Sequence, residues 1–449
     1  MATADRRSEV HRWKQQVLAH YLEDHQLASF DIDGDNAFFV PNQLIVDAQA
    51  ASPVRSRLER YGARRVSGAV RLTRLGVSAQ GSLSDAPAAA EPSRPTTTGG
   101  QEVVDLDPSH GVDVAELALE LSGQHPGAVA PNHLVTGLQR RMGWPDGDPE
   151  PAPAALPPLP SPLPDGGAGV TVAVIDTGWP SAPPPDLNWF GHDTDHATAP
   201  GEVDQAGRPV RHVDQLDADR DGYLDVEAGH GIFVAGLIRR MAPRARLVFL
   251  KALNSDGVGT ELGVARAIRF ATARGVDIIN LSLGFYTVRN ATPSGVERAV
   301  ADARAAGIAL VAAAGNDGLS SPSYPAAFPG VTGVGALTAD GQGLASFSNR
   351  GDWVNVHAPG ERVQSAFVRG QEDQALTDDG GSDRFASNTA LWSGTSFACG
   401  YVSGHLARAL SGPAPASGPT SFSDRAEAVI DALPVMMGAS RRLDPAPAF

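Results

Sequence analysis

Five largely apolar runs after residue 169 constrain the fold of this chain most strongly. They cover residues 170–175, 246–250, 276–281, 309–313 and 331–336. Segments of helical character separate several of these runs, among them 262–274 and 293–306. Strands that are apolar on both faces and alternate with helices are typical of a parallel sheet covered on both sides. The sequence therefore predicts a three-layer α/β domain, with reactive groups beyond the carboxyl ends of its strands.

The first third of the chain has a different pattern. Strand-like segments lie at 42–46, 66–74, 102–106 and 127–135, and helical segments at 52–62 and 114–122. The second helix has the clearest boundaries, because Asp113 can cap it, Glu116 follows three residues later and Gly123 lies just past its end. This order of elements predicts a small α+β domain of ferredoxin-like type over residues 29–143.

Three other segments complete the division of the chain. Residues 1–28 carry apolar residues at helical spacing and are expected to form a helical arm. Residues 78–100 have no hydrophobic periodicity and are expected to be a disordered loop. Residues 144–168 are so rich in proline that we expect a semi-rigid extended linker. The large domain then covers 169–449 and closes with a helix and a tail.

Composition excludes several classes of protein. The single cysteine, Cys399, rules out an internal disulfide and a cysteine-based metal cage. Fifty-one acidic against thirty-six basic residues give a net charge of −15, which argues against nucleic acid as the main partner. No apolar run is long enough for a membrane span, and no signal peptide is apparent. A cytoplasmic location is therefore expected, with secretion as the alternative.

Four motifs in the large domain carry side chains suited to nucleophilic catalysis. Asp176 closes the first strand, His230 stands between two glycines, Asn316 follows a fully apolar strand, and Ser396 precedes an apolar helix. Each motif alone is weak, since Asp and Asn beside glycine are common in turns. Together they supply a nucleophile, a general base, a group that orients the base, and an oxyanion donor.

The chain from about Gly169 to Leu410 resembles the subtilase family of subtilisin-like serine proteases. The order Asp176, His230, Ser396 is the subtilisin order, and chymotrypsin-like enzymes and α/β-hydrolases have other orders. Further stretches of the sequence resemble the family between these motifs, namely 257–263, 276–284, 324–329, 345–349 and 358–360.

The resemblance implies a serine endopeptidase that acts on proteins or peptides through an acyl-enzyme and needs no cofactor for its chemistry. Ser396 would attack the scissile carbonyl, His230 would transfer the proton, and Asp176 would hold the imidazole. Asn316 and the backbone N–H of Ser396 would stabilise the oxyanion. Two segments would form the walls of the substrate cleft: Ser282, Leu283 and Gly284, and Ala313, Ala314 and Gly315.

The N-terminal α+β domain resembles the prosegment of this family, with 129–135 as its final strand. The resemblance implies a zymogen in which this domain is an intramolecular inhibitor, and a maturation site between Gly137 and Gly166. A permanent regulatory domain of similar fold is the alternative.

Three residues depart from the family pattern without removing a catalytic group. Ile232 replaces a threonine, Gly400 replaces a proline, and Cys399 occupies a small-residue position near Ser396. We expect Cys399 to be a small buried residue. Inactivation by bulky thiol reagents at this position is the alternative.

An acidic segment before His230 has the spacing of a calcium loop. The candidate ligands are Asp217, Asp219, Asp221, the carbonyl of Tyr223, and Asp225. The twelfth position is Ala228 instead of glutamate, although Glu227 is adjacent. The segment is expected to bind a structural calcium ion, with a solvated acidic loop as the alternative.

Two other functions stay open on the sequence. One is a catalytically silent subtilase fold that binds or scaffolds other molecules, and the other is a calcium-binding interaction protein. The joint presence of all four catalytic candidates argues against a silent fold.

Overall fold

The structure is a computed structural model, and it describes the chain in segments. These are residues 28–29, 37–47, 50, 52–65, 101–137, 148–154, 156, 159, 165–183, 190, 194–195, 212–218, 220–287, 294–372, 383–412, 420–437 and 440–444. Apart from Ala28, the expected helical arm lies outside these residues. The strand expected at 66–74 and the loop expected at 78–100 lie wholly outside them.

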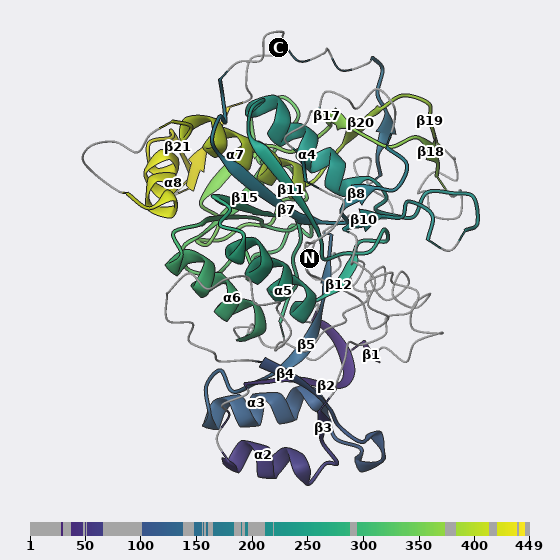
Figure 1. The fold of residues 1–449 in the computed structure, drawn as a ribbon, viewed down its shortest axis with the longest axis vertical. Helices are drawn as coiled ribbons and strands as arrows, with labels where there is room; N and C mark the ends of the chain where they lie inside the picture. Colours follow the sequence, from purple (N-terminus) through teal and green to yellow (C-terminus); the bar gives the residue numbers. More distant parts are fainter. Residues whose placement is uncertain are drawn as a thin grey trace.

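A nine-stranded sheet forms the centre of the large unit (Figure 1). All its pairings are parallel except that of the first two strands in the spatial order. That order is β21 (Val435–Met437), β22 (Ser440–Arg442), β16 (Val356–Pro359), β15 (Val331–Leu337), β14 (Ala309–Ala313), β13 (Ile278–Leu281), β7 (Thr171–Asp176), β11 (Arg246–Lys251) and β9 (Thr194–Asp195). Each of the five predicted apolar runs forms one strand of this sheet.

Helices cover both faces of the central sheet. α4 (His230–Met241) and α7 (Thr395–Ala409) lie on one side, and α5 (Glu261–Ala273) and α6 (Ser294–Ala305) on the other (Figure 1). Successive side chains of β7 point to opposite faces, so Val172 and Val174 pack in one apolar core and Ala173 and Ile175 in the other. α8 (Phe422–Asp431) adds Ile430 to the core beneath α7. The predicted three-layer α/β architecture is confirmed.

The two helices that begin at His230 and Thr395 pack closely because α7 carries glycines on the side facing α4. A Cβ on Gly404 would lie 2.6 Å from the Cβ of Met241, and one on Gly400 would lie 3.1 Å from the carbonyl oxygen of Val234. A side chain at 404 would therefore push the helices apart. Gly400, which departs from the family pattern, is therefore part of the contact between the two helices.

The N-terminal unit is an antiparallel sheet with two helices on one face. Its strands are β2 (Phe38–Asp47), β3 (Arg64–Arg65), β4 (Gln101–Asp105) and β5 (Val129–Thr136), with the two-residue β1 (Ala28–Ser29) beside β2. The spatial order β5-β2-β4-β3 places the first strand between the last and the third, as in a ferredoxin-like unit. The helices are α2 (Ser52–Glu59) and α3 (Val114–Gln124), and a single 3-10 turn, η1, covers Pro108–His110.

The predicted boundaries of α3 are half right. The carboxylate of Asp113 accepts hydrogen bonds from the backbone N–H groups of Ala115, at 2.9 Å, and Glu116, at 3.0 Å, so the predicted cap is confirmed. The predicted end is wrong, because the helix runs through Gly123 and its backbone cap is His125.

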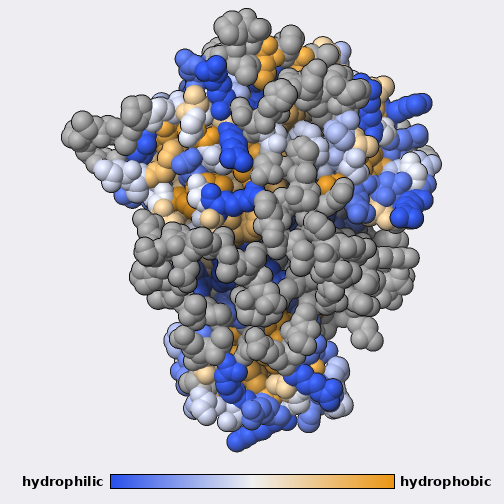
Figure 2. Space-filling model, viewed as in Figure 1, coloured by the Kyte–Doolittle hydropathy of each residue, from blue (hydrophilic) through white to orange (hydrophobic). Residues whose placement is uncertain are grey.

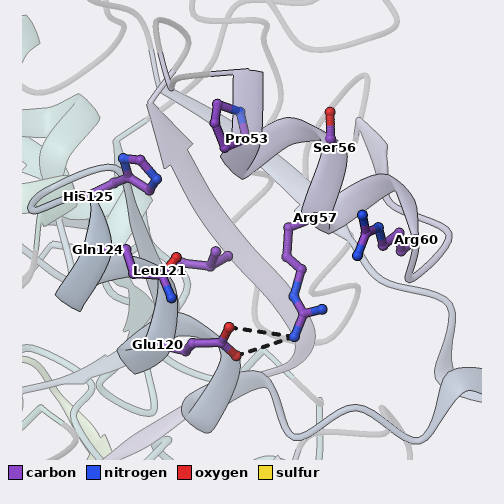
Figure 3. Close-up of a pocket in the computed structure, with 8 residues that line it drawn as sticks. All are labelled: Pro53, Ser56, Arg57, Arg60, Glu120, Leu121, Gln124 and His125. Atoms are coloured by element: carbon purple, nitrogen blue, oxygen red, sulfur yellow. Dashed lines mark hydrogen bonds and ion pairs between the residues drawn. The ribbon is translucent and has the colours of Figure 1, made fainter.

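The N-terminal sheet lies between two sets of helices. Leu44 and Val46 of β2 pack in the apolar core with α2 and α3, whereas Ile45, between them in sequence, packs with Val103 and with Leu262 of α5. Figure 1 shows α2 and α3 below this sheet and α5 and α6 above it. A small pocket between α2 and α3, crossed by the pair Arg57–Glu120, therefore faces away from the large unit (Figure 3).

Part of the proline-rich segment is attached to the large unit. β6 (Glu150–Pro151) pairs antiparallel with β20 (Thr389–Trp392), which also pairs with β17 (Val363–Ala366). Glu150 also forms an ion pair with Arg362, with 2.5 Å between the charged atoms. Proline is compatible with an edge strand, so the backbone is extended as predicted. Its described residues are, however, held against the large unit.

Two short strand pairs and a strand that joins the two units complete the fold. They are β8 (Trp179–Pro180) with β10 (Val213–Asp214), β18 (Gly370–Gln371) with β19 (Arg384–Phe385), and β12 (Val258–Thr260) with β5.

The described surface is mixed in polarity. Hydrophilic side chains interrupt the apolar areas over both units on the face that Figure 2 shows. Within the described segments, no helix is both long and apolar enough to cross a membrane.

Candidate active site

Asp176 and His230 meet at the carboxyl edge of the central sheet. Asp176 is the last residue of β7 and His230 is the first residue of α4. The Nδ1 atom of His230 lies 2.8 Å and 3.0 Å from the two carboxylate oxygens of Asp176, and both side chains are buried. The structure thus brings together two of the side chains that the sequence analysis grouped as catalytic candidates.

A second buried carboxylate, which the sequence analysis did not identify, ties these two loops together. Asp214 accepts hydrogen bonds from the Thr177 hydroxyl, at 2.9 Å, and from the Gly229 N–H, at 2.8 Å. Burial raises the pKa of Asp214, although the nearby charge of Lys251 and these hydrogen bonds oppose the shift. Asp214 has no motif of its own, because its role depends on two loops that are distant in sequence.

Ser396 and Asn316 lie together at the start of α7. The side-chain oxygen of Asn316 accepts hydrogen bonds from the N–H of Thr395, at 2.8 Å, and from its hydroxyl, at 2.7 Å. Ser396 is the second residue of α7, so its N–H is one of the four that have no partner within the helix. A Cβ on Gly394 would lie 3.3 Å from the Asn316 amide nitrogen. The amide nitrogen of Asn316 therefore lies against the turn before Ser396.

Aromatic rings enclose the candidate base. The His230 ring lies 5.5 Å from that of Phe397, the residue after Ser396, and 5.4 Å from that of Trp392. These contacts place His230 beside the turn that carries Ser396 and keep it from water.

The surroundings of His230 favour its protonated form. Burial alone would lower the pKa of His230, but the charges of Asp176 and Glu227, the hydrogen bond to Asp176 and the charge of Asp214 together raise it to about 9. A protonated imidazole cannot accept a proton from Ser396. The surroundings of His230 therefore oppose its neutral form, which is the form that accepts a proton.

The end of the N-terminal unit lies between two segments of the large unit, beside Ser396. The N–H of Thr136 donates to the carbonyl of Gly284, and the N–H of Gly284 donates to the carbonyl of Thr136, both at 3.0 Å. The N–H of Gly137 donates to the carbonyl of Gly257 at 2.7 Å. The Ser396 hydroxyl lies 3.4 Å from the carbonyl oxygen of Gly137. Residues 136–137 thus form a strand between two segments of the large unit, with Ser396 at its end.

The two expected cleft walls are both close to Ser396. In one, the Ser282 hydroxyl donates to the carbonyl of Ser396 at 3.0 Å, Leu283 is fully buried, and Gly284 makes the pairing with Thr136. In the other, the N–H of Gly315 donates to the hydroxyl of Thr395, the residue before Ser396, at 3.0 Å. That wall continues β14 through Ala313 and Ala314, which are both buried.

Cys399 is buried in the core of the large unit, three residues after Ser396. The side-chain amide of Asn280 donates to the Cys399 sulfur at 3.1 Å and to the Ser403 hydroxyl at 3.0 Å. Burial raises the pKa of the Cys399 thiol to about 12. Ile232, the other departure in the helices, is also fully buried. Both residues pack the core, and neither carries a proton-transfer group toward the cleft.

The acidic segment does not assemble a ligand cluster among the residues that are described. The carboxylate of Asp217 accepts from the N–H groups of Asp221 and Gly222, and that of Asp225 accepts from the N–H of Ala218. Asp219 lies outside the described residues, and Tyr223 is exposed. No group of three or more His, Cys, Asp or Glu side chains suited to a metal ion occurs in the described part of the chain.

The sequence is similar to that of known serine proteases. Residues 167–428 match the model of the subtilase family, peptidase S8, over more than half of the chain. The thermophilic serine proteinase of Bacillus sp. (strain AK1) is 33% identical over 249 residues, which cover 53% of this chain and 51% of that protein. Subtilisin BL of Lederbergia lenta is 36% identical over 211 residues, or 45% of this chain and 67% of that protein.

Two further proteins are similar to part of this chain. Subtilisin E of Bacillus subtilis (strain 168) is 33% identical over 258 residues, or 55% of this chain and 56% of that protein. The solved structure of the patellamide maturation protease PatA has a TM-score of 0.46 and 27% sequence identity, covering 62% of this chain and 94% of that one. The alignments thus span about half the length of several relatives.

The chain belongs to the subtilase family of subtilisin-like serine proteases.

Proposed function

We propose that the protein is a serine endopeptidase that cleaves proteins or peptides through an acyl-enzyme on Ser396. The observation that carries the proposal is the pair Asp176–His230, joined at 2.8 Å and next to the turn that bears Ser396. In a relative that cleaves peptide bonds, such a pair accepts the hydroxyl proton and returns it to the leaving amine. No cofactor is required for this chemistry.

The steps follow from the positions of the side chains. His230, once neutral, takes the proton of Ser396 as the hydroxyl oxygen attacks the scissile carbonyl carbon. The developing oxyanion is stabilised by the Asn316 side chain and the N–H of Ser396. His230 then protonates the leaving amine, and water repeats the sequence to release the acid product. Asp176 stabilises the imidazolium in each half of the reaction.

We propose further that the protein is a zymogen in which the N-terminal domain inhibits the large domain. Several contacts between the two units support this. Gly284 and Gly257 bind the backbone of 136–137, as an added strand would be bound. Arg298 of α6 pairs with Asp47 of β2, and Arg269 of α5 donates to Gln101 at 3.0 Å. The maturation site is proposed to follow Gly137, before Gly166.

Labelling by a fluorophosphonate probe tests the proposed activity. The purified chain should be labelled, and the Ser396→Ala chain should not. Equal labelling of both chains, or labelling of neither after an incubation that removes the N-terminal unit, would favour the catalytically silent fold. N-terminal sequencing of an incubated sample tests the zymogen, since a new N-terminus between residues 137 and 166 is expected. A fully active chain that keeps its original N-terminus would support a permanent regulatory domain.

We also keep the proposal that the segment 217–225 binds a structural calcium ion. The support is its spacing of carboxylates and the sharp turn at Gly222, where φ is 93°. A rise in melting temperature with calcium that is lost in Asp221→Ala is expected. A melting temperature that responds neither to calcium nor to a chelator would favour a solvated acidic loop. The same result would exclude a calcium-binding interaction protein.

A further inference from the structure

Glu227 is a buried carboxylate in the cleft that the proposed mechanism does not use. Its side chain is 2% exposed, and its Oε2 atom lies 3.8 Å from Nδ1 of His230. The backbone around it is fixed, because its N–H donates to the carbonyl of Ser255 at 2.8 Å and its carbonyl accepts from the N–H of His230 at 3.0 Å. In the sequence Glu227 is only a neighbour of the acidic segment, whereas in the structure its carboxylate lies beside His230 and Gly137.

The carboxylate of Glu227 fills the space where Gly137 would carry a side chain. A Cβ built on Gly137 would lie 1.9 Å from Oε2, 2.4 Å from Cδ and 2.6 Å from Oε1 of Glu227. All three distances are shorter than real Cβ contacts. The backbone of Gly137 is outside the left-handed region, so other residues could adopt its conformation. The contact with Glu227, not the backbone, is therefore what requires glycine here.

Glu227 has little room to withdraw on the other side. A Cβ on Gly257 would lie 2.6 Å from its Cδ and 2.8 Å from its Cγ. The glutamate side chain is thus held between the two glycines that are hydrogen-bonded to each other across the cleft. Moving it would also separate a buried negative charge from the imidazole of His230, which costs free energy in a site shielded from water.

We propose that Glu227 determines the specificity of the cleft for glycine at the place that Gly137 occupies. The inference rests on the proposed function, because it takes residues 136–137 to lie where the backbone of a substrate lies. A cationic side chain gains no advantage over alanine, since lysine and arginine begin with the same Cβ and meet the same oxygen atoms.

The test uses the full-length chain and the rate at which a fluorophosphonate labels Ser396, scored on the full-length band only. Gly137→Ala is expected to displace the strand from the cleft and to raise the labelling rate about tenfold or more, the size of effect that overpacking produces. In a chain that also carries Glu227→Ala, the same glycine substitution is expected to change the rate by less than about twofold. Glu227→Gln, which keeps the volume, is expected to retain the tenfold effect.

Two control substitutions distinguish a failure of this inference from a failure of the proposed function. Gly123→Ala adds a methyl group in α3 where nothing lies within 4 Å, so it should leave the labelling rate unchanged. Thr136→Pro removes the N–H that donates to Gly284, so it should raise labelling whether or not Glu227 is present. If no chain is labelled, or if Thr136→Pro has no effect, the proposed function fails and the inference fails with it.

Other outcomes contradict the inference while leaving the proposed function intact. One is a Gly137→Ala chain labelled at the original rate while Thr136→Pro is labelled faster. Another is an equal effect of Gly137→Ala with and without Glu227. Slower labelling of Gly137→Arg than of Gly137→Ala would show that Glu227 selects a cation instead of glycine.

Discussion

The Nδ1 atom of His133 lies 2.7 Å from the Oε2 atom of Glu261, and both side chains are buried between the two units of the chain. His133 belongs to β5, and Glu261 is the first residue of α5. The other oxygen of Glu261 accepts from the N–H groups of Gly295 and Val296 at the start of α6. A single carboxylate thus connects the N-terminal unit to the two helices on which it rests.

Removal of His133 should weaken this connection. His133→Ala loses the contact with Glu261 and the ring contact with Phe285, whose centroid lies 5.5 Å away. Leaving a buried carboxylate without one partner costs about 1–3 kcal/mol. We expect the fluorophosphonate to label Ser396 faster in the full-length His133→Ala chain. His125→Ala, at the end of α3 and away from this contact, is the matched control, and equal rates for both variants would refute the role of His133.

The charge of Glu227 should determine where the acidic limb of the pH profile lies. His230 must be neutral to accept the Ser396 proton, so reactivity rises with pH through the pKa of His230, which is about 9 in the arrangement seen here. Glu227→Gln removes one of the charges that raise this pKa, so the limb should move to lower pH. The measurement is the labelling rate of Ser396 against pH, and an unchanged midpoint would contradict the electrostatic coupling.

Cys399 should be inert in the folded protein. The thiolate is the reactive form, and burial raises the pKa of this thiol to about 12. We therefore expect no loss of activity with iodoacetamide, and one reactive thiol after unfolding in guanidinium chloride. Rapid inactivation of the folded chain that Cys399→Ala abolishes would restore the alternative considered from the sequence.

Loss of the oxyanion donor should slow the chemical step far more than binding. Removing one such donor costs about 2.7–4 kcal/mol, or about 10²–10³ in kcat. Asn316→Ala is expected to show this loss with little change in KM. Because Asn316 also binds Thr395, a thermal melt is the accompanying control, and a variant that unfolds early with normal kcat per folded molecule would assign Asn316 a structural role only.

The sequence predicts the layers of the fold better than the details of the site. The strands of the central sheet are apolar on both faces, so their runs identify them without tertiary information, as Val172 to Ile175 illustrate. Asp176 and His230 are recognisable because glycine-containing turns surround them. These local patterns predict that the two residues work together.

Contacts made by distant loops escape such patterns. Asp214 binds the turn after Asp176 and the turn before His230. The carboxylate of Glu227, in the large unit, lies where a side chain on Gly137 of the N-terminal unit would lie. Neither residue has a local pattern of its own, because each acts through a neighbour that only the folded chain supplies. The end of α3 is a smaller case: the helix runs through Gly123 to Gln124, and the N–H of His125 donates to the carbonyl of Leu121.

The central claim is that Ser396, His230 and Asp176 act together on a peptide bond. The direct measurement is kcat/KM for hydrolysis of a peptide by the matured chain and by Ser396→Ala, His230→Ala and Asp176→Asn chains that are shown to be folded. The account predicts losses of about 10⁴-fold or more for each variant, without additivity when two are combined. Hydrolysis by Ser396→Ala at the rate of the unmodified chain would contradict it.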